Sequence, residues 1–255
     1  MYQDCIPLFI NTWRLLFPDI KIVILFINNT IPPELSQYSD HLVLFDKTPT
    51  LSSAFVSQFI RLLYPALIDS SDGVMITDID MIPMNRDYYI KPINDIPTDR
   101  YINMRKGICG DTEIAMCYNI APPYIWSEIF NIHNETDIVN YLTNIYNNIT
   151  YDGDHGGIGW NTDQLELSTK VNQWRISNNA KYIELTDQQT AYNRLDRYNM
   201  QHCFDYKRHY TIKQNILNSS YTDYHICRPV SNPQYNDINN KVYELLKQSN
   251  NVINI

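Results

Sequence analysis

The sequence has 255 residues, a hydrophobic fraction of 44% and a formal net charge of −8 at pH 7. This length allows one large domain or two small ones and is ample for a buried core. The 20 Lys and Arg residues form no cluster. The composition therefore argues against nucleic acid as a partner, because proteins that bind nucleic acid normally carry a basic face.

Hydrophobic periodicity predicts the first elements of the chain. Residues 2–17 carry apolar side chains at helical spacing. Two short buried strands follow at 21–26 and 41–45. The amphipathic run 51–67 forms a helix that leads directly into a buried strand at 74–77. This order predicts a strand–helix–strand unit.

The rest of the chain is predicted as short elements around one loop at 151–160, which holds four of the seven glycines. No repeat, linker or charge run divides the sequence, so we expect one mixed α/β domain spanning 1–255. The other predicted elements are a strand at 113–118, helices at 122–132 and 136–147, a helix beginning at 162–167, a strand at 182–185, an irregular aromatic stretch at 190–233 and a closing helix at 237–247.

Cysteine usage and hydropathy bear on the compartment. No apolar run approaches the ~20 residues needed to span a bilayer, and no signal peptide is evident. We therefore expect a cytoplasmic protein without a transmembrane segment. The odd number of cysteines and the absence of a Cys-x-x-Cys pair favour free thiols. The five are Cys5, Cys109, Cys117, Cys203 and Cys227.

Asp78 and Asp80 follow the predicted strand at 74–77. In an extended chain, residues i and i+2 point to the same side, so both carboxylates would face one point beyond the strand. That edge is where open α/β sheets bind ligands. Paired carboxylates suit Mg²⁺ or Mn²⁺, and such an ion could hold a diphosphate. The alternative is a solvated strand end with turn-forming acids.

Two carboxylates leave such an ion short of the roughly six ligands that it prefers. His225 is the best candidate for a further ligand, and an imidazole favours Mn²⁺ over Mg²⁺ because it is the softer donor. The alternative is a histidine satisfied by its own hydrogen bond. Arg228, or Lys213 nearby in sequence, could add a charge-assisted contact to a phosphate.

Taken together, these motifs resemble those of metal-dependent glycosyltransferases of the GT-A fold, especially the retaining glycogenin and lipopolysaccharide galactosyltransferase group (glycosyltransferase family 8). The stretch Arg-Leu-Leu-Tyr-Pro beginning at Arg61 resembles the group's Arg-Leu helix, whose arginine contacts the donor sugar. Asp78 and Asp80 resemble its metal motif. Asp163 and Gln164 resemble its Asp-Gln pair beside the donor sugar.

The carboxyl-terminal part of the resemblance is His225, which resembles the group's late metal-ligand histidine. The group shows a glycine and a lysine where this chain has Arg228 before Pro229. The group also begins with a strand and loop that hold the nucleotide base, whereas this chain opens in what resembles the following helix. Either the base is held differently, or the amino terminus is truncated.

The resemblance implies an α/β, Rossmann-like GT-A fold with a mixed sheet flanked by helices, here without the usual first strand. It implies transfer of a sugar from a nucleotide sugar, with UDP as the usual carrier, to an acceptor hydroxyl with retention of configuration. It also implies Mn²⁺ or Mg²⁺ as cofactor. Whether the acceptor is a glycan or a protein stays open. The donor-binding residues that it implies are Arg61, Asp78, Asp80 and Arg228.

Asp163 and Gln164 are the candidate catalytic residues. Under the resemblance, Asp163 orients the donor sugar and Gln164 lies near the anomeric carbon. An amide is a poor nucleophile, so a front-face mechanism is favoured over a covalent one. An inverting enzyme would instead use Asp163 or Asp154 as a general base. Without the resemblance, Asp163 can be read as a carboxylate that stabilises a helix N-terminus, and Arg61 as a surface ion pair.

The glycine-rich loop is the candidate acceptor or sugar site, since glycines let the backbone approach a ligand closely. Trp160 could stack on a sugar face. The alternative is an ordinary surface loop. The residues that we single out here are Asp154, His155, Gly156, Gly157 and Trp160.

Three other functions compete with glycosyl transfer. A haloacid-dehalogenase-type phosphatase carries its Asp-x-Asp in the first strand, unlike this chain. A sugar-activating nucleotidyltransferase needs a glycine-rich phosphate loop near the start, and none is present. A catalytically weak or inactive nucleotide- or sugar-binding protein is the runner-up.

Overall fold

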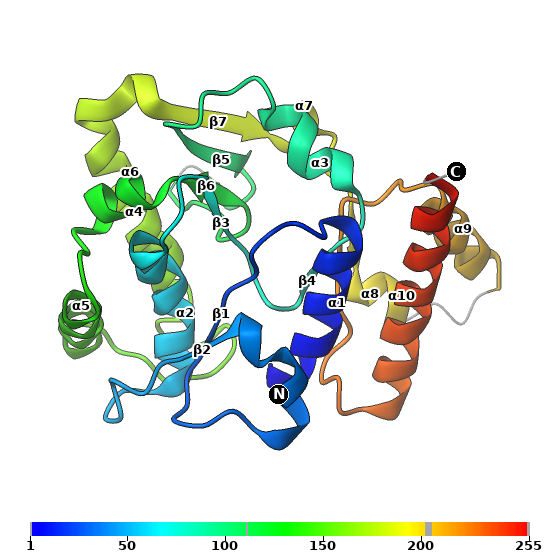
Figure 1. The fold of residues 1–255 in the computed structure, drawn as a ribbon, viewed down its shortest axis with the longest axis horizontal. Coiled ribbons are helices and arrows are strands. Elements are labelled where there is room, and N and C mark those ends of the chain that lie inside the picture. Colours follow the sequence, from blue (N-terminus) through cyan, green and yellow to red (C-terminus); the bar gives the residue numbers. More distant parts are fainter. Residues whose placement is uncertain (1, 111, 202–205, 254–255) are drawn as a thin grey trace. The chain divides into compact units, whose positions relative to one another are not determined.

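The computed structural model describes residues 2–110, 112–201 and 206–253 (Figure 1). The chain divides into two compact units, and each is described by itself. Unit 1 comprises Met1–Ile22, Asp78–Asp95 and Gln188–Ile255, and unit 2 comprises Val23–Thr77 and Ile96–Asp187. The single domain expected from the sequence stays a prediction.

The main sheet of unit 2 has four strands in the order β3-β6-β5-β7. β3 and β5 both run antiparallel to β6, whereas β5 runs parallel to β7, so the sheet is mixed. β1 and β2 form a separate parallel pair. The strands are β1 (Ile24–Phe26), β2 (Leu42–Leu44), β3 (Val74–Ile76), β5 (Tyr101–Lys106), β6 (Asn119–Ala121) and β7 (Tyr182–Thr186).

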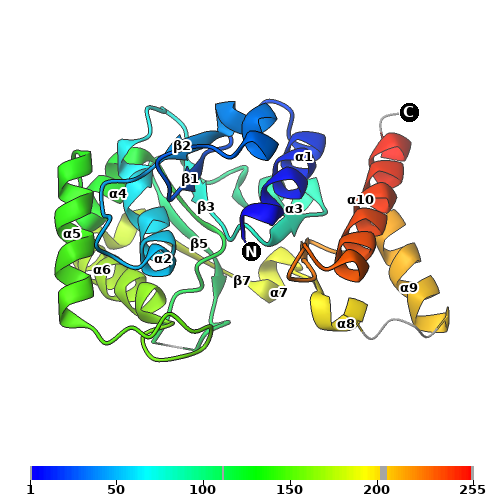
Figure 2. The same cartoon turned by 90° about the horizontal axis from the view of Figure 1, so that it is seen from below.

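Helix α2 is the centre of the helical layer in unit 2, and it packs against α4, α5, α6 and β1 (Figures 1 and 2). Its apolar stripe is buried, and the rings of Phe55 and Phe59 lie 4.6 Å apart. Trp126 ties α4 to the sheet, because its indole N–H lies 3.1 Å from the Ala121 carbonyl oxygen and 3.3 Å from that of Val74. The helices are α2 (Ser53–Leu63), α4 (Pro123–Phe130), α5 (Glu135–Asn148) and α6 (Thr162–Asn178).

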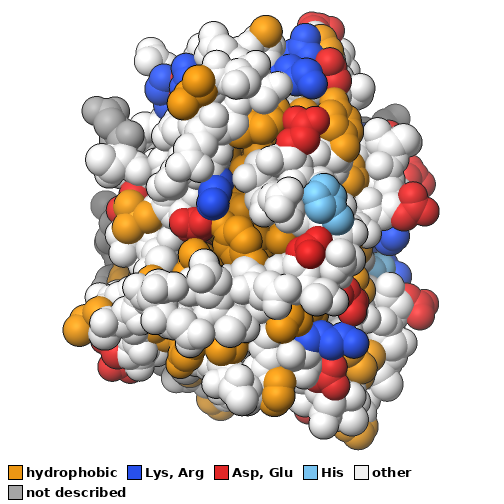
Figure 3. Space-filling model, turned by 90° about the vertical axis from the view of Figure 1, so that its left-hand side faces the viewer, with side chains coloured by type: hydrophobic (Ala, Val, Ile, Leu, Met, Phe, Trp, Pro, Cys, Tyr) orange, Lys and Arg blue, Asp and Glu red, His pale blue; other side chains and the backbone are white. Residues whose placement is uncertain are grey.

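Figure 3 views the molecule from the side of α5 and α6. Hydrophobic side chains line a hollow on this face, and charged side chains of both signs are scattered around it. No broad basic area is seen on this face.

Unit 1 is built on a three-stranded sheet in the order β4-β9-β8, where β4 (Met81–Pro83) is antiparallel and β8 (Arg194–Asp196) parallel to β9 (Asp223–His225). Its core joins apolar side chains of the amino-terminal helix region, this sheet and the two carboxyl-terminal helices. The helices are α1 (Ile6–Leu16), α3 (Arg86–Ile90), α8 (Arg197–Gln201), α9 (Tyr206–Leu217) and α10 (Pro233–Ile253); α7 (Asp187–Thr190) lies at the sequence boundary of the units.

Short 3₁₀ helices complete the fold at Gln3–Cys5, Pro33–His41, Tyr64–Leu67, Lys91–Ile93 and Asn179–Lys181. None of the helices described here is long and apolar enough to cross a bilayer. Among the described cysteines, which are all but Cys203, no disulfide bond forms. Cys203 lies outside the described residues.

The predicted α/β class, with mixed sheets flanked by helices, is confirmed. Within the described residues, no strand precedes β1. The predicted strand at 113–118 is wrong: Tyr118 has a φ of +83°, and the Asn119 side-chain amide donates to the carbonyl oxygens of Ala115 and Met116, which stabilises a turn. The irregular stretch expected at 190–233 is also wrong, because it contains β8, α8, α9 and β9.

Candidate functional site

The segment holding the two aspartates is a turn. The Met81 N–H donates to the Asp78 carbonyl oxygen at 3.1 Å, which places Ile79 and Asp80 at its centre. The extended geometry expected for 78–80 is therefore wrong, and alternation along a strand does not orient these carboxylates. The Ile226 N–H donates to the Asp80 carbonyl oxygen at 3.0 Å, which joins the turn to the end of β9. Asp80 is buried and Asp78 is half-buried.

Three side-chain nitrogens approach one oxygen of Asp80. Oδ2 lies 3.2 Å from His225 Nε2, 3.1 Å from Arg228 Nε and 3.9 Å from Arg197 Nη1. The Arg228 contact is an ion pair that is not aligned as a hydrogen bond. Burial raises the pKa of Asp80, but the His225 hydrogen bond and the charges of the two arginines outweigh it and hold this pKa below its ordinary value.

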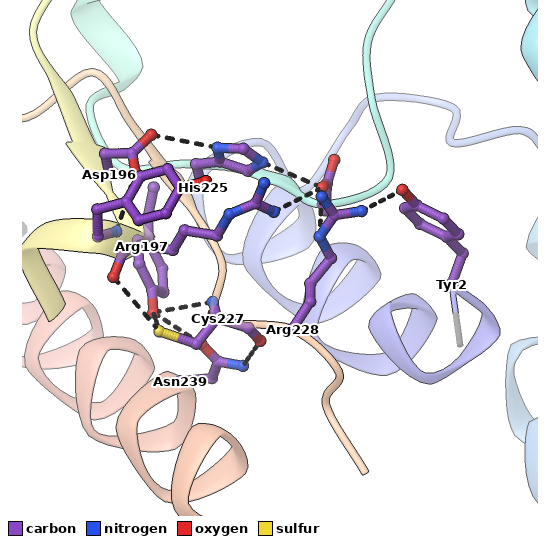
Figure 4. A network of polar contacts seen from close by, with 10 residues as sticks. Tyr2, Asp196, Arg197, His225, Cys227, Arg228 and Asn239 are labelled. Carbon is purple, nitrogen blue, oxygen red and sulfur yellow. Dashed lines mark hydrogen bonds and ion pairs between the residues drawn. The ribbon is translucent and has the colours of Figure 1, made fainter. Parts of the chain in front are cut away.

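His225 lies between two carboxylates. Its Nδ1 is 3.2 Å from Asp196 Oδ2, on the opposite side of the ring from Asp80 (Figure 4). Asp196 and His225 are direct neighbours in the β8–β9 register. A neutral imidazole has only one N–H, so it can donate to one carboxylate but not to both. The other contact requires a second proton or a cation. A histidine held by a carboxylate through its far nitrogen is the usual arrangement in metal sites.

The donor types fit Mn²⁺ or Mg²⁺, since Asp78 and Asp80 offer hard oxygens and His225 an imidazole. In the part of the chain that the structure describes, however, no three His, Cys, Asp or Glu side chains are already gathered around one point. Asp80 is instead balanced by guanidinium groups. An ion that binds Oδ2 of Asp80 would therefore compete with its arginine partners.

A buried network supports this cluster from behind. Asn239, on α10, accepts hydrogen bonds from the Tyr224 hydroxyl at 2.7 Å and the Cys227 N–H at 3.1 Å, and donates to the Cys227 carbonyl oxygen at 3.0 Å (Figure 4). Cys227 stands between His225 and Arg228 in sequence. Asn239 thus fixes the backbone that carries both side chains.

Arg228 is also held from the amino terminus. Its guanidinium lies 4.9 Å from the centre of the Tyr2 ring and donates to the Tyr2 hydroxyl (Figure 4). The sequence predicted the meeting of Asp80, His225 and Arg228, but not the roles of Tyr2 or Arg197. Lys213, the other basic candidate, is exposed on α9. Asp196 and Asn239 are further residues that were missed.

A second pair of candidate residues meets in unit 2. Arg61 Nη2, on α2, lies 2.8 Å from Oδ2 of Asp163, at the start of α6. Only 2% of the Asp163 side chain is exposed, and its other oxygen accepts the Gln164 N–H at 2.9 Å. Arg61 Nε also donates to the Gln58 carbonyl oxygen. Gln58 in turn donates to the Trp160 carbonyl oxygen at 3.2 Å, so the loop is attached to α2.

The loop at 151–160 is organised by Asp152. The Asp152 carboxylate accepts the N–H groups of Asp154 at 2.9 Å and Ile158 at 2.7 Å, and these bonds lower the pKa of Asp152. A Cβ on Gly157 would lie 2.5 Å from that carboxylate, so a larger residue here would displace the group that organises the loop. Asp154, His155 and Gly156 are exposed, Gly157 and Trp160 are not, and the rings of His155 and Trp160 lie 4.6 Å apart.

Comparisons with known proteins add a structural likeness only. No protein-family model matches the sequence, and no curated protein matches it. The chain is similar to the crystal structure of the galactosyltransferase LgtC in complex with donor and acceptor sugar analogues. The two share 12% sequence identity over 96% of this chain and 91% of that chain, with a TM-score of 0.47.

Proposed function

We propose that this protein is a metal-dependent glycosyltransferase of the GT-A type, which moves a sugar from a nucleotide sugar to an acceptor hydroxyl with retention. UDP is the expected carrier. The proposal is carried by the approach of His225 to within 3.2 Å of Asp80, across 145 residues of sequence, with Arg228 on the same oxygen. In a nucleotide-sugar site, the residues that bind the metal ion and the residues that bind the phosphates must lie this close together.

Asp78, Asp80 and His225 are the residues that would hold Mn²⁺ or Mg²⁺. When bound, the ion supplies Lewis-acid stabilisation of the charge that develops on the leaving diphosphate. With the ion bound, His225 Nδ1–H would donate a hydrogen bond to Asp196, which leaves the lone pair of Nε2 on the ligand side. Arg228 makes a charge-assisted contact to the diphosphate.

Arg61, Asp163 and Gln164 are proposed to contact the donor sugar. The ion pair with Arg61 holds the buried Asp163 carboxylate in place, and its remaining lone pairs would accept hydrogen bonds from sugar hydroxyls. Gln164 stabilises the transition state as a neutral dipole, which suits a front-face, retaining mechanism. Asp154 and the exposed part of its loop are proposed to meet the acceptor. Inversion, with Asp163 or Asp154 as base, is the outcome that product NMR distinguishes.

The second candidate is a catalytically weak or inactive nucleotide- or sugar-binding protein. One observation favours it: Asp80 already has its charge balanced by Arg197 and Arg228. A protein of this kind would bind UDP or a nucleotide sugar without a metal requirement and would not hydrolyse it.

A thermal-shift screen of nucleotide sugars with and without Mn²⁺ identifies the donor, and hydrolysis of that donor tests the site. We expect Mn²⁺-dependent hydrolysis that falls more than about 100-fold in Asp80→Asn, because ligand loss costs at least as much as loss of a supporting residue. Asp87→Asn, at an exposed carboxylate of α3, is the control and keeps full turnover. Equal turnover in Asp80→Asn removes the metal assignment, and binding without turnover in the wild type supports the second candidate.

A further inference from the structure

Two arginines in unit 1 are largely buried around a single carboxylate. The side chains of Arg197 and Arg228 are 13% and 11% exposed, and both form ion pairs with Asp80 Oδ2. Arginine is seldom buried without a partner that balances its charge. In this cluster the charges of Asp80 and Asp196 balance those of the two guanidinium groups.

A divalent cation at Asp80 would upset this balance. Bound to Oδ2, it would compete with the two guanidinium groups for the shared oxygen and add a positive charge beside them. A diphosphate restores neutrality, because it brings several negative charges, and its oxygens match the fork of N–H donors on arginine. Metal and diphosphate are therefore expected to bind here as a pair.

The two arginines are held differently. Arg228 is anchored by Tyr2, through both a hydrogen bond and a ring contact. The ion pair of Arg197 Nη1 with Asp80 Oδ2 is longer, at 3.9 Å, than that of Arg228 Nε, at 3.1 Å. The Arg197 guanidinium lies 5.6 Å from the ring centre of its neighbour Tyr198. Its backbone is fixed, because it directly follows Asp196, which is paired with His225. Arg197 is thus the arginine whose side chain is freer to change partners.

We propose that Arg197 is a diphosphate-binding residue: its guanidinium pairs with Asp80 while no divalent ion is bound there, and would pair with the diphosphate when Asp80 and His225 hold an ion. This exchange rests on the proposed function. It makes metal and nucleotide each promote the binding of the other, with coupling that is reciprocal.

Titration calorimetry of Arg197→Met tests the exchange with two ligands. Mn²⁺ alone should bind about tenfold more tightly than to the wild type, because Asp80 loses a competing cation. UDP at saturating Mn²⁺ should bind about tenfold more weakly, because a charge-assisted contact is lost. Opposite changes in the affinities for Mn²⁺ and UDP are diagnostic, since a general structural defect would weaken the binding of both ligands. Lys241→Met, at an exposed lysine of α10, should change neither affinity.

Arg197→Lys keeps the charge but not the planar fork, so it should leave Mn²⁺ affinity as in the wild type and lower UDP affinity. If Arg197→Met binds Mn²⁺ no more tightly than the wild type, or UDP equally well, the exchange is overturned while the proposed function stands. If the wild type itself binds no UDP in the presence of Mn²⁺, the proposed function fails and the exchange falls with it.

Discussion

Replacing Asn239 by alanine is expected to destabilise unit 1 and the segment that carries His225 and Arg228. Only 1% of Asn239 is exposed. The substitution removes its three hydrogen bonds to Tyr224 and Cys227. Of the groups left behind, the Cys227 N–H still lies 3.3 Å from the Tyr224 hydroxyl, and that hydroxyl keeps the Cys227 sulfur, at 3.4 Å, as a weak acceptor. The Cys227 carbonyl oxygen loses its Asn239 partner.

The magnitude follows from those losses. The buried carbonyl oxygen that loses its partner costs about 1–3 kcal/mol, and the hydrogen bond lost by the Tyr224 hydroxyl costs about 1 kcal/mol, so the two together cost about 2–4 kcal/mol. Alanine returns about 0.5 kcal/mol through its higher helix propensity. We expect the free energy of unfolding to fall by about 3 kcal/mol, measured by urea denaturation with a circular dichroism signal.

Asn240→Ala is the matched control, because this residue follows in the same helix and is exposed. It gains the same helix propensity and should change stability by no more than about 0.5 kcal/mol. A loss below about 1 kcal/mol in Asn239→Ala would show that the network does not support the cluster, because one lost hydrogen bond alone costs that much.

Three further predictions concern substitutions or labelling at single residues. Arg61→Met should cost about 3 kcal/mol in urea unfolding because it leaves buried Asp163 unpaired, and a double-mutant cycle with Asp163→Asn that shows no coupling would refute the pair. Gly159→Ala should lower the melting temperature more than Gly156→Ala in calorimetry: both have positive φ, but only the Gly159 Cβ would meet a backbone oxygen, at 2.5 Å. Burial raises the pKa of Cys5 to about 12, so its thiol stays protonated at pH 8 and should resist iodoacetamide in the native protein. Labelling of Cys5 without denaturant, seen by mass spectrometry, would contradict this.

Strong periodicity made the helical part of the fold predictable. The amphipathic runs at 51–67, 122–132 and 136–147 correspond to α2, α4 and α5, within a few residues at each end. Each of these helices buries one face, so apolar residues recur at helical spacing in its sequence. The boundary of α5 is set by a capping box between Asn134 and Asp137.

Strand β5 was missed because its polar residues face the interior. Asn103 and Arg105 are both buried, and Arg105 is satisfied by two contacts with Asp187, at 3.0 and 2.7 Å. Tyr101, Ile102 and Met104 are buried too, so both faces of the strand are covered and its sequence shows no alternation of apolar and polar residues. Asp187, the partner of Arg105, lies 82 residues away in sequence, so no local pattern predicts this ion pair.

The candidate site divides in the same way. Ligand chemistry nominated His225 as a partner of Asp80, and the family resemblance nominated Arg61 and Asp163 as separate donor-sugar residues. The structure brings Asp80 close to His225 and Arg61 close to Asp163. Asp196 and Arg197 were missed, because their position depends on the pairing of β8 with β9. The short alternation Arg-Leu-Asp before Arg197 was the available signal, and it is too short to predict a strand by itself.

The central claim is that Asp80 and His225 hold a divalent ion together with a nucleotide diphosphate. Crystals grown with UDP and Mn²⁺, with anomalous data collected at the manganese edge, test it most directly. We predict an anomalous peak at coordination distance from Asp80 and His225 Nε2, with the diphosphate on its other side. UDP bound without a peak at these residues, or a peak elsewhere, would contradict the account.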